Sequence, residues 1–361
     1  MMAFETKQGA DGFRKFSYKF KELVGVTYRD GTWVSTNEVS CNEKMSIKVG
    51  KCLPEEHPEK WMEYLSPDVT EQTQMKDLVI PGSHDSASFD LDPGSGRAND
   101  VTSYIELAEE KFERWFKTQN LDFTEQLKIG VRYFDLRTIK HPVTGNFHFV
   151  HGLFSHKTVE KYLKDIRRFL DKNKKEVVLL DFNHFYNMRK YNHRSLCTII
   201  EKSFNEMMLN RKKSLYNNMT VSKITLSKLL ELNARVIVLY GSANKCKDHE
   251  HIWSRDEVDI LWPFTANKYS VVDNLIHEYK NLSRKDIIVV WPGILTPFED
   301  DYYLERMKSF SNLHEFVTPI LEIMVKWIKS RPNIPFNIIS ADFVEEHDFI
   351  KTVIRANNKS L

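Results

Sequence analysis

The residue types best suited to chemistry in this chain lie where short apolar runs end. IPGSHDSASF places His84 and Asp85 directly after such a run, VRYFDLR carries Asp135 and Arg137, and NFHFVHG contains His151. Two imidazoles with a cation between them suit phosphodiester cleavage by a neighbouring hydroxyl group. One imidazole takes the hydroxyl proton, the guanidinium steadies the phosphoryl charge, and the second imidazole protonates the leaving oxygen.

The charged pair in VRYFDLR has two interpretations. Side chains alternate along a strand, so Val131, Tyr133, Asp135 and Arg137 share one face. An aspartate and an arginine in an apolar strand cannot both lie unpaired in the interior. The pair is either a structural ion pair at a barrel rim or a fixed guanidinium for a phosphate group. Gly152, after the last histidine, permits a sharp turn or a close approach of substrate.

From about residue 76 the chain alternates short apolar runs with amphipathic segments. The predicted strands are 77–82, 131–137, 146–152, 176–185, 235–242, 286–293 and 336–344, and the predicted helices are 103–116, 159–173, 193–209, 270–282, 302–329 and 347–357. This pattern predicts a parallel α/β fold, closed as a barrel or open and doubly wound. Two strands follow each other without a helix, so the pattern is not regularly eightfold. In such barrels the chemistry sits at the carboxyl ends of the strands.

The chain divides into two predicted parts. Residues 1–60 are a small β-rich extension, with a hairpin around Arg-Asp-Gly in KELVGVTYRDGTWVSTNEV and a further strand in SIKVGK. Residues 61–361 form the barrel domain. The hydrophobic content of 41% is ample for a core.

Bulk properties exclude several classes of protein. The net charge of +2 is too small to indicate a nucleic-acid-binding protein. The amino-terminal segment lacks the apolar core of a secretory signal, and no apolar run approaches the roughly 18 residues that cross a bilayer. The four cysteines (Cys41, Cys52, Cys197 and Cys246) form no CxxC pair. We therefore expect no zinc site, no disulfide framework and a reducing, cytoplasmic location.

Several motifs together resemble one known family. PGSHDSASF, GVRYFDLR, FVHGLF, LLDFNHFYNM and the chain end VIRANNKSL resemble the X domain of phosphatidylinositol-specific phospholipase C. More narrowly, they resemble the eukaryotic proteins that contain this domain without other phospholipase modules. The resemblance runs from about Trp61 to the carboxyl terminus. It implies an irregular TIM-type barrel that cleaves phosphatidylinositol to diacylglycerol and inositol phosphate through a 1,2-cyclic phosphate.

The resemblance also implies roles for the histidines and the arginine. His84 matches the general base, which takes the inositol 2-hydroxyl proton, and His151 matches the general acid. Arg137 falls where the metal-independent bacterial members hold an arginine and the calcium-dependent ones hold a calcium-binding aspartate. A fixed positive charge disfavours calcium at that position, so we expect no metal and no cofactor.

Carboxylates match as well, and two positions depart from the pattern. Asp135 matches the family's carboxylate two residues before the arginine, and Asp85 matches the carboxylate beside the first histidine. Asp342 in IISADF matches the aspartate that pairs with the general base in the bacterial enzymes. Asn183 replaces a basic or metal-binding residue. Near RVIVLYGS, Leu239 and Tyr240 stand where the bacterial members have a basic headgroup contact. Asn183 and Tyr240 are the predicted substrate contacts. Because both depart from the family pattern, the resemblance does not establish which headgroup the protein accepts.

The expected partner is phosphatidylinositol in a membrane. No separate lipid-binding module is present, so the barrel rim must contact the bilayer peripherally. Aromatic side chains favour the bilayer interface. Candidate contacts are Trp115, Phe116, Phe154, Trp291, Tyr302 and Tyr303. The alternative is that these rings pack between helices and the barrel.

Two other functions are compatible with such a barrel. One is a lipid- or inositol-phosphate-binding protein that has lost useful turnover, which the neutral Asn183 favours. The other is a metal-dependent glycerophosphodiesterase, whose chemistry requires a cluster of carboxylate ligands after its first histidine. Arg137 and the sequence Asp85-Ser86 argue against the latter.

Overall fold

The structure is a computed structural model. It describes residues 26–29, 32–35, 53–100, 109–216, 219–284, 286–296, 309–331 and 333–358. Residues 1–53 and 54–361 form separate compact units. In the first unit, β1 (Val26–Arg29) and β2 (Thr32–Ser35) pair antiparallel, as the predicted hairpin requires. The predicted strand in SIKVGK lies outside the described residues.

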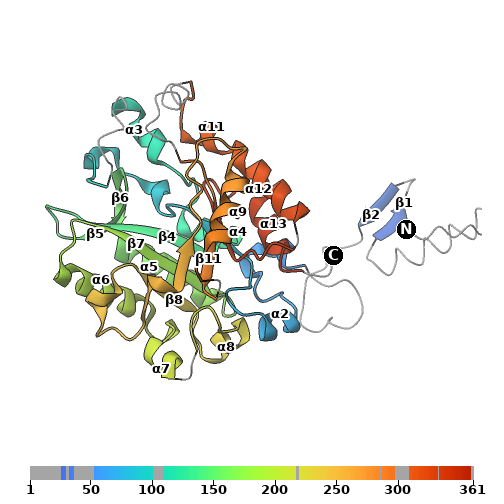
Figure 1. The fold of residues 1–361 in the computed structure, drawn as a ribbon, viewed down its shortest axis with the longest axis horizontal. Helices are drawn as coiled ribbons and strands as arrows, with labels where there is room; N and C mark the ends of the chain where they lie inside the picture. The colour runs from blue at the N-terminus through green and yellow to red at the C-terminus, as the bar shows by residue number, and fades with distance from the viewer. Residues whose placement is uncertain are drawn as a thin grey trace, which may run out of the picture. The chain divides into compact units, whose positions relative to one another are not determined.

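The second unit is built on a curled, mainly parallel sheet (Figure 1). Its path runs β10 (Val258–Ile260), β11 (Ile288–Gly293), β12 (Ile338–Ala341), β3 (Ile80–Ser83), β4 (Tyr133–Lys140), β7 (Val178–Tyr186), β8 (Val236–Tyr240) and β9 (Ile252–Ser254). Every neighbouring pair on this path is parallel. In the part of the chain that the structure describes, β9 and β10 do not pair, so the sheet is a half-barrel. The predicted irregular TIM-type α/β fold is confirmed.

An antiparallel extension leaves the sheet at β4. β5 (Phe147–His151) pairs with β4, and β6 (Leu153–Thr158) pairs with β5. This is the pair of successive strands that the sequence predicts without an intervening helix. The extension carries His151 to the carboxyl end of the parallel strands, because β5 returns toward the level of Arg137 from the far end of β4.

Helices join the parallel strands. They are α2 (Pro67–Gln72), α3 (Glu109–Phe116), α4 (Phe123–Ile129), α5 (Val159–Lys172), α6 (Lys190–Phe204), α7 (Arg211–Tyr216), α8 (Leu226–Glu231), α9 (Val271–Asn281), α11 (Leu313–Val317), α12 (Pro319–Ser330) and α13 (Phe349–Arg355). Local signals determine their ends. In α4, Asp122 and Glu125 form a capping box, and Gly130 ends the helix with a left-handed φ of 118°. No helix among the described residues is long and apolar enough to cross a membrane.

The core follows from the apolar continuity of the strands. All five residues of β8 and all six of β11 are buried, as expected for parallel strands that are covered on both faces. The predicted bilayer contacts are part of this core. Trp115, Phe116, Phe154 and Trp291 are each at most 6% exposed, so their assignment to the rim is wrong. Tyr302 and Tyr303 lie outside the described residues.

One cysteine expectation is also wrong. Cys197 of α6 and Cys246 of the short 3-10 turn η7 (Ala243–Cys246) form a disulfide, with their Cα atoms 6.7 Å apart. Both residues are buried. The two cysteines are 49 residues apart in the chain, so no short spacing motif could predict the disulfide. The cysteine pattern therefore does not support a reducing location.

Candidate active site

The first histidine of the site follows β3 directly. Gly82 lets this strand lie close to β4, since a Cβ there would be 2.8 Å from Cδ1 of Tyr133. The backbone N–H of His84 donates to the carbonyl of Ala341 at the end of β12 (3.0 Å). Its Nδ1 lies 2.7 Å from Oδ1 of Asp342, the residue that follows β12. The imidazole is thus held by two neighbouring strand ends, with Nε2 turned inward.

Asp85 lies at the centre of the site. Its φ of 41° is left-handed, a conformation that aspartate adopts more readily than most residues. Its side chain is only 1% exposed, and Oδ1 lies 2.6 Å from Nε of Arg137. Its Oδ2 lies 3.2 Å from Nε2 of both His84 and His151. One carboxylate therefore links both imidazoles and the guanidinium.

The β4 pair forms the second side of the site. Nη2 of Arg137 lies 3.0 Å from Nε2 of His84 and 3.7 Å from Oδ2 of Asp135. Asp135 Oδ2 also accepts from the backbone N–H of Asp85 (2.9 Å). The register of β4 against β7 shifts at Leu136/Arg137 and skips Asn183, an irregularity typical of strands beside active sites.

The second imidazole comes from β5. Nδ1 of His151 lies 2.6 Å from the carbonyl oxygen of Phe116, so it must carry the proton in that contact. Nε2 is therefore the atom available for proton transfer. The ring centroids of His151 and His84 are 6.5 Å apart. Gly152 has a φ of 70°, and a Cβ there would lie 2.5 Å from the Phe116 ring. The group that approaches Gly152 closely is therefore this ring, whereas the sequence suggested substrate.

Charge sets the protonation of the site. Burial lowers the pKa of His84, but Asp85 and Asp342 raise it by more, to about 9. Burial raises the pKa of Asp135, whereas Arg137 and His84 lower it by more, to about 2. For the guanidinium of Arg137, burial lowers the pKa and the two flanking aspartates raise it above its ordinary value. Asp135 and Arg137 are therefore permanently charged at neutral pH.

The centre of the site retains hydrogen-bonding capacity. Both carboxylate oxygens of Asp85 and Nε of Arg137 are buried, yet none has an aligned hydrogen bond to the described residues. Their short contact is an ion pair without hydrogen-bond geometry. Buried polar groups in this condition are costly and are common where a ligand binds.

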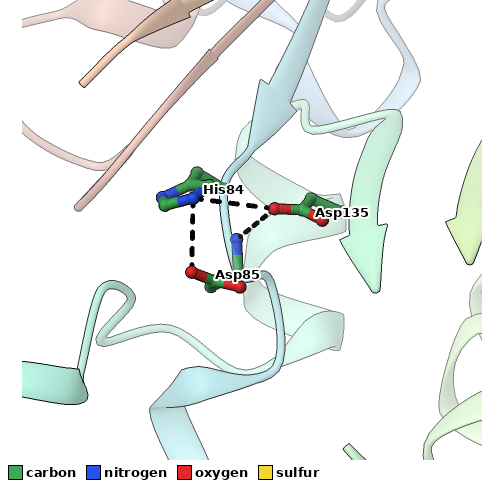
Figure 2. Close-up of side chains that lie close together, drawn as sticks. All are labelled: His84, Asp85 and Asp135. Carbon is green, nitrogen blue, oxygen red and sulfur yellow. Dashed lines mark hydrogen bonds and ion pairs between the residues drawn. The ribbon is translucent and has the colours of Figure 1, made fainter. Parts of the chain in front are cut away.

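The same region contains a possible set of metal ligands. His84, Asp85 and Asp135 offer ligand atoms within 4.8 Å of one another, the only such group among the described residues (Figure 2). The guanidinium of Arg137, however, contacts all three of these side chains. A cation is thus already supplied by the protein, and a metal ion bound by this group would require Arg137 to move.

The two predicted substrate contacts differ in position. Nδ2 of Asn183 donates to Oδ1 of Asp135, so Asn183 belongs to the cluster but its amide is engaged there. Tyr240 is fully buried and does not reach the cluster, because its hydroxyl lies 3.0 Å from Nδ1 of His193 on α6. Tyr240 pairs in register with Phe182 of β7. Phe182 lies between Asp181 and Asn183, so its side chain points to the opposite face of the sheet from theirs. The position of Tyr240 therefore corrects the prediction that it contacts substrate.

The structure adds residues that the sequence patterns did not single out. The Trp262 ring lies 5.7 Å from the His84 ring. Deeper in the barrel, Asp181 accepts from Tyr133 (2.7 Å) and pairs with Arg255 (3.1 Å). Trp262 and Arg255 flank β9 and β10, which are three residues each and carry little periodic signal. The one sequence signal that could have identified Arg255 and Trp262 is their position just after a strand.

The fold defines a class of protein. A solved structure of phosphatidylinositol-specific phospholipase C from Staphylococcus aureus matches 85% of this chain over 99% of its own length, with a TM-score of 0.59 and 19% identity. The Listeria monocytogenes phosphatidylinositol-specific phospholipase C matches 83% and 98%, with a TM-score of 0.56. The chain thus has the α/β half-barrel of bacterial phosphatidylinositol-specific phospholipases C.

Sequence comparison gives the family. The PI-PLC X family model matches residues 112–280. The mouse PI-PLC X domain-containing protein 3 is 32% identical over 310 residues, covering 82% of this chain and 92% of the relative. The zebrafish PI-PLC X domain-containing protein 3 is 33% identical over 311 residues, with the same coverage. The chain belongs to the PI-PLC X domain-containing proteins, and the resemblance seen in its motifs is confirmed.

Proposed function

We propose that this protein is a metal-independent phosphodiesterase that cleaves phosphatidylinositol. The observation that carries the proposal is the placement of two imidazoles, 6.5 Å apart, on either side of the Asp85–Arg137 pair. Oδ2 of Asp85 lies 3.2 Å from the Nε2 atom of each imidazole, so both Nε2 atoms face the same small volume beside Arg137. The unaligned hydrogen-bonding groups of Asp85 and Arg137 point to a polar ligand at the same place.

In the first step, Nε2 of His84 takes the proton of the inositol 2-hydroxyl, and the oxygen attacks phosphorus. Arg137 stabilises the charge on the phosphoryl oxygens. The bond from phosphorus to the diacylglycerol oxygen breaks, and Nε2 of His151 gives that oxygen its proton. The products are diacylglycerol and inositol 1,2-cyclic phosphate. Asp342 and the carbonyl of Phe116 hold the two imidazoles in the orientations that this exchange needs.

In the second step the roles reverse. His151, now neutral, takes a proton from water, which attacks the cyclic phosphate, and His84 returns its proton to the 2-oxygen. The product is inositol 1-phosphate. No proton or charge is left over, and both histidines end as they began.

A specific observation favours a second function, a phosphoinositide-binding protein with little turnover. The amide of Asn183 donates to Asp135, and β7 itself (Val178–Tyr186) contains no lysine or arginine. A His84 pKa of about 9 also leaves little neutral base at neutral pH. Binding without cleavage is the outcome that these features would produce.

The test is release of diacylglycerol from phosphatidylinositol in mixed micelles, by the wild-type protein and by His84→Ala. The matched control is His156→Ala, whose side chain on β6 is 52% exposed. We expect His84→Ala to be slower by at least about a hundredfold and the control to be unchanged. Equal rates for all three proteins would contradict the assignment of His84, and binding of the lipid without any release would support the second function.

A further inference from the structure

A further carboxylate reaches the candidate active site from a loop. Asp100 follows the 3-10 turn η5 (Pro93–Ser95) and lies at no strand end, so the strand-end pattern did not single it out. Its Oδ2 accepts from the backbone N–H of Gly152, the residue directly after His151 (2.9 Å). It also interacts with His151 through charge. The proposed mechanism uses His151 as the general acid but gives Asp100 no role.

The loop that carries Asp100 holds the turn after His151. The backbone N–H of Ala98 donates to the carbonyl of Gly152 (2.8 Å), while Asp100 accepts from the N–H of the same residue. Both backbone groups of Gly152 are thus bound by this loop, at the point where β5 turns back into β6 with a φ of 70°. The carbonyl of Phe116 holds Nδ1 of the imidazole. His151 is therefore fixed both through its ring and through the peptide that follows it.

The charge of Asp100 is buried and only partly satisfied by hydrogen bonds. Its Oδ1 is buried and has no hydrogen-bond partner among the described residues. Burial raises the pKa of Asp100, and the N–H of Gly152 and the charge of His151 lower it in part. A buried carboxylate with one unsatisfied oxygen is stabilised by positive charge nearby, and it stabilises that charge in return.

Other charged and titratable groups face the same pair from neighbouring strands. Asp85, after β3, contacts both imidazoles through its Oδ2. Arg137 on β4 and Tyr186 at the end of β7 interact with Asp100 through charge. Burial raises the pKa of Tyr186, so this side chain is uncharged at neutral pH. Asp100, in contrast to Asp85, is bound to the turn beside His151.

We propose that Asp100 is the positioning residue of the general acid. Through the N–H of Gly152 it holds the turn that aims His151, and its carboxylate is the counter-charge that keeps the imidazole protonated until the leaving oxygen takes the proton. This inference rests on the proposed function, because the role is required only if His151 donates a proton. Asp100 itself takes up no proton and contacts no reacting atom.

Two variants and a matched control separate charge from hydrogen bonding. In Asp100→Asn the amide oxygen can still accept from the N–H of Gly152, so the turn keeps its contact while the negative charge is lost. Asp100→Ala removes both. Asp92→Asn is the control, because Asp92 lies in the same stretch of chain and its Oδ1 accepts from the backbone N–H of Gly94 (2.8 Å). Its side chain is 36% exposed and pairs with the exposed His156.

A pair of substrates detects the loss of acid catalysis. Phosphatidylinositol needs a proton on its leaving oxygen, whereas the 4-nitrophenyl ester of inositol 1-phosphate releases nitrophenolate without one. We expect Asp100→Asn to cleave phosphatidylinositol about tenfold more slowly, which corresponds to one pH unit in the protonation of the acid, and the nitrophenyl ester at the wild-type rate. Asp100→Ala should be slower still on phosphatidylinositol, and Asp92→Asn should be unchanged on both. Equal slowing of both substrates in Asp100→Asn, or no slowing of either, would overturn the proposal.

A titration that needs no turnover separates this inference from the proposed function. The imidazole of His151, assigned by comparison with His151→Ala, is followed by NMR as the pH is varied. We expect its titration midpoint to lie about one pH unit lower in Asp100→Asn and to stay in place in Asp92→Asn. An unchanged midpoint in Asp100→Asn would overturn the role of Asp100. If the wild-type protein cleaves neither substrate, the proposed function fails, and the titration alone still decides whether Asp100 holds the proton on His151.

Discussion

Oδ1 of Asp342 lies 2.7 Å from Nδ1 of His84, although 258 residues separate them in the chain. The contact exists because β12 and β3 are parallel neighbours, so both residues follow strands that end at the same level. In the neutral imidazole this contact keeps the proton on Nδ1 and leaves Nε2 unprotonated, as the proposed role of general base requires. It also contributes to the raised pKa of His84.

The pH dependence of Asp342→Asn tests this role. The base must be neutral, so the rate should rise with pH through the His84 pKa of about 9. Replacing Asp342 removes a charge that raises this pKa, and the rising limb should move to lower pH. The measurement is kcat/KM against pH for the wild type and the variant. A limb that stays in place would contradict the assignment of that ionisation to His84.

The same ionisation should appear in stability. The folded pKa of His84 is above its ordinary value of 6.5, so protonation stabilises the fold fully below about pH 6.5. This contribution is lost as pH rises through about 9. The free energy of unfolding should fall over that interval in the wild type and fall less in Asp342→Asn. Chemical denaturation at several pH values measures both, and identical slopes would argue against the raised pKa.

Arg137→Lys separates charge from geometry. Lysine keeps the positive charge but cannot contact Asp85, Asp135 and His84 together, as the guanidinium does. We expect a loss of about a hundredfold in kcat with a smaller change in KM, because these contacts orient the guanidinium toward the charge that would develop on the phosphoryl group. A variant with full activity would show that a point charge is sufficient.

Gly152→Ala tests the support of His151. The new Cβ would lie 2.5 Å from the Phe116 ring, and the carbonyl of Phe116 holds Nδ1 of His151. We expect a loss of about 1–3 kcal/mol in stability and a slower rate. Gly145→Ala is the matched control, since its φ of 68° is similar but nothing lies nearer than Nζ of Lys140 at 4.0 Å. Equal effects in both variants would assign the loss to backbone strain alone.

Much of the site could be predicted from strand ends. The apolar runs before His84, around Asp135, before His151 and before Asp342 were long enough to identify as strands. For the strands that carry His84, Asp135 and Asp342, parallel pairing then required the carboxyl ends to meet. The strand before His151 pairs antiparallel instead, so this rule does not explain the position of His151. The contact of Asp85 with both imidazoles could not be predicted, because it depends on a left-handed φ at that residue.

Other features depend on tertiary packing that the sequence does not encode locally. Tyr240 was assigned to the wrong face, since an all-buried strand such as β8 has no polar alternation to distinguish its two sides. The same reason applies to Trp291 of the all-buried strand β11, which was expected at the rim. Trp115 lies on helix α3 and packs into the core from there. The three-residue strands β9 and β10 were too short to detect, and Arg255 and Trp262 were missed with them.

The most direct test of the central claim is phosphorus NMR of phosphatidylinositol cleavage in micelles that contain EDTA. The account predicts that the wild-type protein forms inositol 1,2-cyclic phosphate before inositol 1-phosphate, at the same rate with EDTA as with added calcium. His84→Ala should form neither product. Cleavage that requires calcium, or acyclic phosphate appearing with no cyclic intermediate, would contradict catalysis by the two histidines and Arg137.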